Sequence, residues 1–530
     1  MITLNKNQTI YEAFAHCAKE SLNEVALVYQ HRHFTYWHVL KKVNSLAYSL
    51  KKLGYKKDDV ITIMLPNVPM AVYLLYAVNQ IGAVANLIHP LMKEEQLRGI
   101  MEKTKSKILF TLDSNVNHLL NLEKIGVSIY AVSPVDELNI CLRLAYGMKQ
   151  KRVNKFYAHN LCGKEIYTDS DHDYMKDSFY LHSGGTTGEP KTIALSNFSL
   201  NALAISGLKI LDEASPRNLG MLSVLPMFHG FGLCMGIHAS LMNGAFNVLI
   251  PKFHSKTVIG YLKKGELQTL IGVPILYEAL LHNKDFKGKN LDKIHNAFVG
   301  GDAPSESLIK RFNERMIEAG AKARMFEGYG LTETVTVCTV NTHPYHRDGS
   351  VGRPIPFTEV KVFNNGKAVK PNTFGELYVR GETLMNGYRF ENKVTNPFYI
   401  DKKKQKWVKT GDYGKVDQDG YVYFVQRLKR IIKVNGINVF PSEIENEVSM
   451  LPYVYECYAK AVQDAKHGNM INLFVVLDKN KSDKNNYDEE FRKIIENKFG
   501  VYALPKKIIY MDKLPKTLVG KIDEKQLKDE

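Results

Sequence analysis

The chain has 530 residues, of which 45% are hydrophobic and 24% are charged, and its formal net charge is +16. This length predicts two to four domains, and the composition is that of a globular protein with a large core. The lysines stand in small groups with acids among them, as at 402–406 and 506–507, which argues against a basic nucleic-acid-binding block or helix.

Short apolar runs alternate with longer helical patterns through the first two-thirds of the chain. Four runs are typical of buried strands: residues 60–65, 107–112, 246–250 and 296–301. Residues 305–319 predict a helix that follows Pro304 and Ser305 and ends before Gly320. Its expected apolar face consists of Leu308, Ile309, Phe312, Met316 and Ile317. This alternation predicts an α/β fold with largely parallel sheets.

The pattern changes near residue 358, where three strand-like runs follow one another with short turns between them. These runs are 359–363, 375–381 and 421–425. We expect a β-rich subdomain over about 350–427, shaped as a distorted barrel. A helix then begins at Pro441 and Ser442, with Glu445 placed to complete a capping box. The spacing predicts an N-terminal domain over 1–428 and a small α+β domain over 429–530.

The six cysteines lie far apart and form no CxxC pair. Such spacing argues against a zinc site or a disulfide framework and favours a reducing compartment. The first twenty residues lack the apolar core of a signal peptide. The most apolar stretch, 222–250, is interrupted by Pro226 and several glycines, so it predicts strand, turn and helix rather than a membrane span. We therefore expect a cytoplasmic protein.

Residues 181–192, LHSGGTTGEPKT, combine glycines, hydroxyl groups and a lysine in a short loop. Glycine lets backbone N–H groups approach a ligand closely, and the side chains add further donors, so the loop suits a polyanion such as a nucleotide triphosphate. An ordinary turn has a similar composition. The spacing does not fit the GxxxxGK[ST] pattern of ATPases and kinases.

Six further motifs follow in order. They are LPMFHGFGL (225–233), VGGDAP (299–304), FEGYGLTET (326–334), KTGDYG (409–414), QRLKRIIKVNGINVFPSEIE (426–445) and PKTLVGKID (515–523). Together with the glycine-rich loop they resemble the acyl-adenylate-forming (AMP-binding) superfamily. That superfamily includes acyl-CoA synthetases, luciferases and the adenylation domains of peptide synthetases. The resemblance covers almost the whole chain and is greatest to bacterial medium- and long-chain fatty acyl-CoA synthetases.

The resemblance implies that a carboxylate attacks the α-phosphate of ATP, Mg²⁺-pyrophosphate departs, and coenzyme A then accepts the acyl group. It implies an ATP site formed by Ser183, Gly184, Gly185, Thr186, Thr187, Gly188, Lys191, Gly301, Asp302, Ala303, Gly328, Tyr329, Gly330, Thr332, Asp412, Arg427 and Lys521. Within it, Tyr329 faces the adenine, while Asp412 and Arg427 resemble a ribose-binding pair. Each of these charges, taken alone, would more often be an ordinary surface residue.

Three residues carry the catalytic roles that the resemblance implies. Lys521 corresponds to the lysine that bridges the attacking carboxylate and the α-phosphate, and Thr332 supplies a hydroxyl to that phosphate. Glu333 is the expected oxygen ligand of Mg²⁺. The small C-terminal domain is expected to rotate after adenylation, with Lys429 at the hinge. Lys433 and Gly436 would then face the thiol side of the site.

The acyl pocket is expected at Phe228, His229, Gly300 and Gly330. The segment from Phe228 to Ile237, including Phe231 and Leu233, is apolar and has no acid, which suits an alkyl or aryl acid over an amino acid. Two alternatives remain within the superfamily: a ligase that loads an acyl carrier protein, and an aryl-CoA ligase. A non-catalytic nucleotide-binding scaffold is an alternative of another class. The partners expected are the acid, ATP and CoA, with no nucleic acid and at most peripheral membrane contact.

The sequence departs from the family pattern at three positions. His182 stands where an aromatic residue is common, Thr192 where glycine usually follows the loop lysine, and Gln426 where Gly or Asp is usual. None of these changes removes an expected phosphate, metal or ribose contact. The first two are expected to reshape the flanks of the glycine-rich loop.

Overall fold

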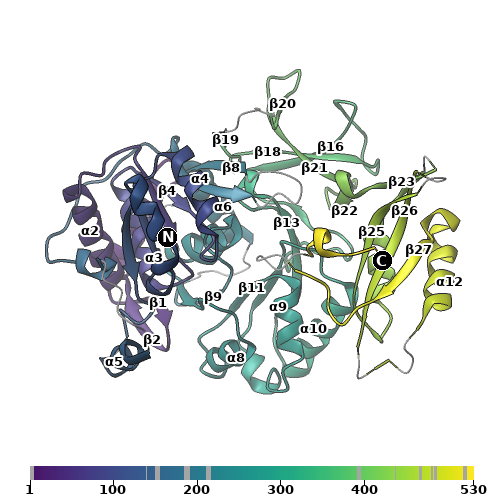
Figure 1. Ribbon diagram of the computed structural model, residues 1–530, viewed down its shortest axis with the longest axis horizontal. Coiled ribbons are helices and arrows are strands. Elements are labelled where there is room, and N and C mark those ends of the chain that lie inside the picture. The colour runs from purple at the N-terminus through teal and green to yellow at the C-terminus, as the bar shows by residue number, and fades with distance from the viewer. Residues whose placement is uncertain are drawn as a thin grey trace.

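The structure is a computed structural model, shown in Figure 1. It describes residues 5–138, 140–149, 156–183, 191–210, 217–390, 396–435, 437–464, 468–478, 481–482, 486–516 and 522–529. Seven predicted site residues lie outside these ranges: Gly184, Gly185, Thr186, Thr187, Gly188, Gly436 and Lys521.

The N-terminal part is built on two mostly parallel sheets, which confirms the predicted α/β class. The first sheet has the order β15-β14-β13-β12-β11-β9-β10-β1-β2. Its strands are β1 (Val25–Tyr29), β2 (Arg32–Thr35), β9 (Gly220–Ser223), β10 (Phe246–Leu249), β11 (Thr269–Gly272), β12 (Asn296–Val299), β13 (Met325–Gly330), β14 (Val337–Val340) and β15 (Arg353–Pro354). Antiparallel pairs occur toward its two edges, between β1 and β2, between β13 and β14, and between β14 and β15.

The second sheet has the order β19-β8-β7-β4-β3-β5-β6. Its strands are β3 (Val60–Met64), β4 (Val84–Leu87), β5 (Ile108–Leu112), β6 (Ser128–Val132), β7 (Asp177–Ser183), β8 (Lys191–Ser196) and β19 (Gly387–Arg389). The pairs from β7 to β6 are parallel, whereas β8 and β19 add antiparallel strands. The β19 strand comes from the β-rich region, so it ties that region to this sheet.

The β-rich region forms a six-stranded antiparallel sheet at the top of Figure 1. The strand order is β17-β16-β18-β21-β20, and β22 also pairs with β21. The strands are β16 (Thr358–Asn364), β17 (Lys367–Ala368), β18 (Gly375–Gly381), β20 (Phe398–Ile400), β21 (Lys406–Val416) and β22 (Val422–Arg427). The three runs predicted from the sequence correspond to β16, β18 and β22.

The C-terminal part lies at the right of Figure 1. It has a hairpin of β23 (Ile432–Val434) and β24 (Ile437–Val439), and a sheet of β25 (Val454–Asp464), β26 (Gly468–Leu477) and β27 (Pro505–Tyr510). Apolar side chains of α11 (Pro441–Ser449) and α12 (Asp488–Phe499) pack with this sheet in one core, which includes Ile444, Phe491 and Leu473. The predicted α+β character is confirmed.

The other helices belong to the N-terminal part. The α-helices are α1 (Ile10–Glu20), α2 (Tyr36–Lys52), α3 (Pro69–Gln80), α4 (Glu94–Thr104), α5 (Ile140–Lys149), α6 (Asn197–Ile210), α7 (Ala239–Leu241), α8 (Ser255–Lys263), α9 (Pro274–Leu281) and α10 (Glu306–Ala319). Helix α3 is buried along its whole length, because its sequence is apolar all round and it belongs to the largest core cluster.

Short helical turns complete the structure. The 3₁₀ turns are η1 (Asp113–His118), η2 (Leu120–Ile125), η3 (Ala158–Leu161), η5 (Gly288–Leu291), η6 (Thr332–Thr334), η7 (Leu428–Arg430), η8 (Val501–Ala503) and η9 (Glu524–Gln526). A π-helix, η4, spans Phe231–His238. Within the apolar stretch 222–250, η4 and α7 lie between the end of β9 and β10, so the predicted strand and helix are both present. Among the described residues, no helix is both long and apolar enough to cross a membrane.

Helix α10 shows how local sequence sets an element's ends. The Ser305 hydroxyl accepts from the Leu308 backbone N–H at 3.2 Å, and Gly320 ends the helix with φ of 73°. Leu308 and Phe312 are buried as predicted. The prediction for Ile317 is wrong, because its side chain is 77% exposed. Ile317 lies about 100° around the helix from the buried Met316, outside the strip formed by Leu308, Phe312 and Met316.

The capping box predicted at Ser442 and Glu445 is also wrong. The N-cap of α11 is Phe440, and no side chain caps the helix. The Ser442 hydroxyl instead donates to the Val425 carbonyl oxygen at 3.1 Å, and the Glu445 carboxylate pairs with Arg430 at 2.7 Å. Both side chains therefore serve contacts at the junction between the two parts of the chain rather than the helix end.

All six cysteines are free thiols, and they differ sharply in exposure. Cys141 on α5 is exposed, Cys162 is half-buried and the other four are buried. Burial raises the pKa of Cys17 to about 11 and that of Cys338 to about 12. These buried thiols therefore hold their protons at neutral pH.

Candidate active site

The glycine-rich loop is flanked by two paired strands. β7 and β8 are antiparallel, with Ser183 opposite Lys191 and His182 opposite Thr192. The strand pair therefore brings the two ends of the loop together at one end of β7 and β8. Lys191, at the start of β8, places its Nζ 4.4 Å from the centre of the Tyr388 ring.

His182 and Thr192, which depart from the family pattern, contact each other beside the loop. The Nε2–H of His182 donates to Asn86 Oδ1 at 2.7 Å, which leaves Nδ1 to accept from the Thr192 hydroxyl at 3.3 Å. Asn86 in turn donates to Thr62 at 3.0 Å. Burial lowers the pKa of His182 to about 4, so the ring is neutral and serves as a fixed hydrogen-bonding link. The two residues that depart from the family pattern are therefore linked to each other by a hydrogen bond.

Tyr329, Asp412 and Arg427 are brought together although they are far apart in the sequence. The Tyr329 hydroxyl on β13 donates to Asp412 Oδ2 at 2.7 Å, and Phe424 stacks on the Tyr329 ring at 5.6 Å. Asp412 on β21 lies opposite Arg427 on β22, and their Oδ1 and Nε atoms are 3.6 Å apart. Because Phe424 occupies one face of the Tyr329 ring, an adenine would have to stack on the other.

The Asp412 carboxylate is far more deeply buried than the side chain of its partner Arg427. Its side chain is 3% exposed, whereas that of Arg427 is 64% exposed. Among the described residues, Oδ1 of Asp412 has no hydrogen-bond donor. Burial raises the pKa of Asp412, and the opposing pull of the Arg427 charge is weaker. A buried carboxylate oxygen without a donor fits a ligand hydroxyl, such as one from a ribose.

Glu333 lies in the η6 turn and is held by Tyr388. The Tyr388 hydroxyl on β19 donates to Glu333 Oε1 at 2.8 Å, and the Glu333 carbonyl oxygen accepts from Met385 N–H at 2.9 Å. No group of three or more His, Cys, Asp or Glu side chains that could hold a metal occurs within the described ranges. One carboxylate fits Mg²⁺ nonetheless, because Mg²⁺ commonly takes one or two carboxylates together with substrate phosphates.

Sequence reasoning missed Tyr388 as a site residue. Its ring is close to Lys191 and its hydroxyl contacts Glu333, because β19 pairs with β8 in register Tyr388 to Ile193. No local pattern could have revealed this long-range pairing. Glu327 was also missed: burial, with Glu306 and Asp348 nearby, raises its pKa to about 7. This carboxyl on β13 therefore changes charge near neutral pH.

The backbone around Glu333 is strained and tightly packed. Val335, which follows η6, has φ of 64° and ψ of −60°, a conformation that costs about 1–3 kcal/mol in a β-branched residue. Val335 is fully buried, so its surroundings hold it there. A Cβ on Gly330 would lie 1.4 Å from the Thr336 carbonyl oxygen, so this position requires glycine. Thr332 lies on the same turn, half-buried.

The predicted turn at 300–303 follows β12 directly. Gly301 has φ of 81°, and the backbone N–H of Ala303 donates to Asp302 Oδ1 at 3.0 Å. Gly301, Asp302 and Ala303 are all exposed, so the turn is accessible to a ligand. A Cβ on Gly300 would lie 3.1 Å from the Gly328 carbonyl oxygen, so the two predicted glycine segments lie side by side.

The predicted acyl-pocket residues lie next to a small apolar cluster. This cluster consists of Met221, Leu225, Phe231, Met235, Ile271, Val273 and Phe298. The Phe231 ring is 3.5 Å from the position a Gly300 Cβ would take, so the cluster reaches the turn described above. Leu233 and Ile237 are fully buried in the main core instead, because they lie about half a turn of η4 away from Phe231 and Met235. Met235 was not predicted.

Three aromatic rings pack together at Phe228. The ring of Phe228 lies 4.7 Å from the His229 ring and 4.7 Å from the His89 ring. Phe228 is buried and His229 is half-buried. The predicted pair thus forms part of a three-ring group that includes His89.

The predicted hinge lies between two side-chain contacts. The N-terminal part ends with the Arg427–Asp412 pair, and the C-terminal part begins with the Arg430–Glu445 pair. Between them, Leu428 and Lys429 are exposed in η7. Lys433 is exposed on β23, some residues further along.

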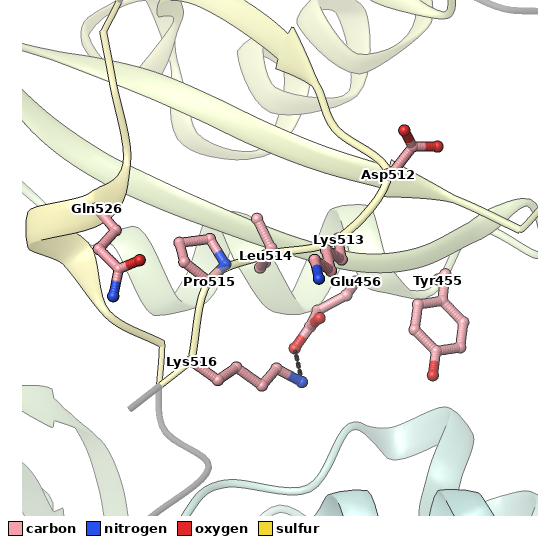
Figure 2. Close-up of a pocket in the computed structure, with 8 residues that line it drawn as sticks. All are labelled: Tyr455, Glu456, Asp512, Lys513, Leu514, Pro515, Lys516 and Gln526. Carbon is pink, nitrogen blue, oxygen red and sulfur yellow. Dashed lines mark ion pairs between the residues drawn. The ribbon is translucent and has the colours of Figure 1, made fainter. Parts of the chain in front are cut away.

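The segment that carries Lys521 is flanked by Lys516 and Ile522, which pair with each other. Lys516 forms an antiparallel bridge with Ile522, and its Nζ pairs with Glu456 of β25 at 2.8 Å. Figure 2 shows this pair at the edge of a cavity of about 530 Å³, lined also by Tyr455, Lys513 and Pro515. Tyr455 is 6.3 Å from the His282 ring at the end of α9, so this edge of the C-terminal part faces the N-terminal part.

Comparisons with known proteins cover nearly the whole chain. Residues 14–389 match the family described as AMP-binding enzyme, and residues 443–521 match AMP-binding enzyme C-terminal domain. A long-chain-fatty-acid–CoA ligase of Bacillus subtilis is 26% identical over 99% of this chain and 95% of its own length. One from Salmonella typhimurium is 28% identical over 100% of this chain and 96% of its own length.

Solved structures share the fold. The ATP-bound MatB from Rhodopseudomonas palustris superposes with a TM-score of 0.85 at 21% identity, covering 97% of each chain. The anthranilate CoA ligase AuaEII in complex with anthranoyl-AMP gives a TM-score of 0.84 at 20% identity, covering 99% of this chain and 97% of its own.

Proposed function

We propose a function on one premise: the chain belongs to the AMP-binding enzyme family. It is an ATP-dependent, AMP-forming ligase of the acyl-CoA or aryl-CoA type, like the curated relatives that it matches over its full length. Its reactants are a carboxylic acid, ATP with Mg²⁺, and coenzyme A. The acid is first joined to AMP with release of pyrophosphate, and the acyl group then passes to the thiol.

We propose that the acid is a medium- or long-chain fatty acid. The observation that carries this proposal is the apolar cluster beside Gly300, which includes Phe231, Met235 and Phe298. Apolar walls with few polar groups suit an alkyl chain, because burying it stabilises the complex by about 0.8 kcal/mol per methylene. The names of the curated relatives support the same acid class.

The site residues have proposed roles in the first step. Asp412 and Arg427 hold the ribose hydroxyls, and Tyr329 stacks on the adenine. The glycine-rich loop and Lys191 hold the β- and γ-phosphates. Lys521 contacts the attacking carboxylate and the α-phosphate, and Thr332 donates to that phosphate. Catalysis of this kind depends on positioning and on charge stabilisation as the P–O bonds exchange.

Glu333 is the proposed ligand of Mg²⁺, which when bound neutralises charge on the pyrophosphate leaving group. Tyr388 holds the carboxylate of Glu333 at 2.8 Å and covers the Lys191 ammonium with its ring. It therefore fixes the relative position of two groups that face the same phosphates. We propose that Tyr388 is a positioning residue for both.

Replacing Tyr388 with phenylalanine should raise the Mg²⁺ concentration needed for half-maximal adenylation by roughly tenfold, since the Glu333 carboxylate loses its orienting donor. The ring and its contact with Lys191 remain. A Mg²⁺ titration of MgATP binding by calorimetry should shift in parallel.

Tyr399→Phe is the matched control, because Tyr399 also donates its hydroxyl, to Gly366 O at 2.8 Å, but does so away from the site. Equal Mg²⁺ midpoints in wild type and Tyr388→Phe would contradict the positioning role.

The second step needs the C-terminal domain to move, and we place the domain boundary at residues 428 and 429, as the sequence predicts. Leu428 and Lys429 are exposed between two fixed contacts, so rotation there disturbs few interactions. Lys433 and Gly436 are proposed to reach the thiol side afterwards.

Replacing Lys429 with proline should slow thioester formation by roughly tenfold or more while adenylation changes little, because proline fixes φ at the hinge. Single-turnover assays separate the two steps. Lys429→Ala should leave both steps nearly unchanged, and an equal loss of both in the proline variant would argue against the hinge.

An acid panel tests the proposed substrate. Pyrophosphate release is measured with octanoate through palmitate and with benzoate, followed by thioester formation with CoA or with an acyl carrier protein. Turnover of the fatty acids with CoA is the expected result. Turnover of benzoate alone would support the aryl-CoA alternative, and turnover only with carrier protein would support the acyl-carrier alternative.

A cytoplasmic location is proposed as well, because free thiols persist in reducing compartments.

A further inference from the structure

A row of polar side chains crosses the interior of the second sheet. The segments that carry it follow one another in the sheet order β8-β7-β4-β3-β5. Its members, which we call the polar row, are Thr192 on β8, His182 on β7, Asn86 on β4, Thr62 on β3 and Ser106 directly before β5. Asn86 and Thr62 are fully buried, and Ser106 is 2% exposed. Buried polar groups are costly unless each one finds a partner.

Each member of the polar row is hydrogen-bonded to the next. The Thr192 hydroxyl lies 3.3 Å from His182 Nδ1, and His182 Nε2 lies 2.7 Å from Asn86 Oδ1. Asn86 Nδ2 donates to Thr62 Oγ1 at 3.0 Å, and the Thr62 hydroxyl donates to Ser106 Oγ at 2.8 Å. The contacts therefore form an unbroken chain from β8 to the start of β5.

The last contact of the polar row fixes the direction of the others. The Ser106 hydroxyl donates to the Ile108 carbonyl oxygen at 3.2 Å, and a carbonyl oxygen can only accept. Ser106 therefore accepts from Thr62, which accepts from the amide of Asn86. The Asn86 oxygen in turn accepts from His182. This leaves His182 with its proton on Nε2 and with Nδ1 as an acceptor, which is the neutral form of the ring.

The adjacent row on the same face of the sheet is apolar. It consists of Val60, Val84, Tyr180 and Ala194, which pack in one cluster and stand two positions from members of the polar row on the same strands. Side chains two positions apart on a strand share a face. Apolar side chains fill such a buried position without needing partners, so packing alone does not account for the polar row.

The polar row lies next to the two ends of the glycine-rich loop. His182 and Thr192 form a cross-strand pair, and the next pair is Ser183 with Lys191, the first and last residues of the loop. The row also links β7 to β4 and β3, and each of these two strands is paired on both sides within the sheet. The interior of the sheet therefore sets the position of the strands from which the loop begins and ends.

We propose that His182 is a positioning residue for ATP, which through the polar row fixes Ser183 and Lys191 where the loop holds the β- and γ-phosphates. His182 acts through β7 and β8, because both of its ring nitrogens are hydrogen-bonded within the sheet. Loop ends that are fixed before binding lose less conformational freedom when the triphosphate binds. The inference rests on the proposed function, since ATP is the expected ligand of the loop.

Calorimetric binding of MgATP and of AMP to the full chain, without any acid, tests the positioning role. AMP lacks the β- and γ-phosphates, so its binding reports only on the adenine, ribose and α-phosphate contacts. His182→Phe keeps an aromatic ring and removes both hydrogen bonds. It should raise the Kd of MgATP about tenfold and that of AMP less than about twofold, because only the phosphate end of the site loses its support.

A second variant tests whether the polar row acts as a unit, because Thr62 lies two strands away from β7. Thr62→Val keeps the shape of the side chain but removes the acceptor of the Asn86 amide. It should raise the Kd of MgATP about threefold, and Thr62→Ser should restore the wild-type value.

Thr111→Val is the matched control. Thr111 is fully buried on β5 of the same sheet, and among the described residues its hydroxyl has no hydrogen-bond partner. The variant should bind MgATP like wild type.

An unchanged Kd of MgATP in both His182→Phe and Thr62→Val would overturn the proposal. Equal weakening of MgATP and AMP would overturn it too, since the polar row would then support the fold in general rather than the phosphate site. If His182→Phe does not fold, the comparison of Thr62→Val with Thr62→Ser decides by the same criteria. Failure of wild type itself to bind MgATP would contradict the proposed function, and this inference with it.

Discussion

Replacing Lys521 with alanine should lower the rate of acid-dependent pyrophosphate release about a hundredfold or more. Loss of one group that stabilises charge in the transition state typically costs about 3–4 kcal/mol. ATP binding and folding should change little, because the nucleotide is expected to be held mainly by the N-terminal domain. Pyrophosphate–ATP exchange and calorimetric ATP binding measure the two effects separately.

The control is Lys525→Ala, because Lys525 is an exposed lysine four residues further along the chain. Synthetic acyl-AMP provides a second check: thioester formation from it should proceed at a similar rate in wild type and Lys521→Ala. An unchanged rate of pyrophosphate release in Lys521→Ala would refute the assignment of this lysine.

Replacing Glu333 with glutamine should lower adenylation by about a hundredfold at limiting Mg²⁺, because the amide keeps the shape of the side chain but loses the charge that attracts the metal. The amide oxygen can still accept from Tyr388, so the η6 turn should keep its conformation. Calorimetry should show weaker binding of MgATP and little change in binding of ATP with EDTA.

Excess Mg²⁺ should recover part of the lost rate in Glu333→Gln but none in Lys521→Ala, so one titration distinguishes the two roles. The exposed acid Glu489 on α12 offers a matched control as Glu489→Gln. If MgATP binds equally well to wild type and Glu333→Gln, Glu333 is not the metal ligand.

Local sequence predicted the elements whose stability is local. The strand-like runs at 60–65 and 246–250 became β3 and β10, and the helix signals at Ser305 and Gly320 set the ends of α10. These predictions succeed because apolar period and capping depend on neighbours in sequence. The predictions for Ile317 and Ser442 failed, since packing on other elements decided the exposure of one and the partner of the other.

The site residues show the same difference between local sequence signals and long-range contacts. Motifs identified Tyr329, Asp412 and Arg427, and the structure brings these three together. Tyr388 could not be found, because its role depends on a pairing between β19 and β8 that is distant in sequence. The link between His182 and Thr192 also required the structure, since a departure at either position alone looks like a loss. Met235 becomes visible only once η4 is known to be a π-helix.

The uneven exposure of the thiols offers a direct way to observe α5. Cys141 is the exposed cysteine, whereas the buried ones carry raised pKa values that suppress the reactive thiolate. A maleimide dye added to the native enzyme should therefore attach selectively at Cys141, without any engineering of the chain. A fluorophore whose emission increases in apolar surroundings would then report in real time whether another molecule covers α5.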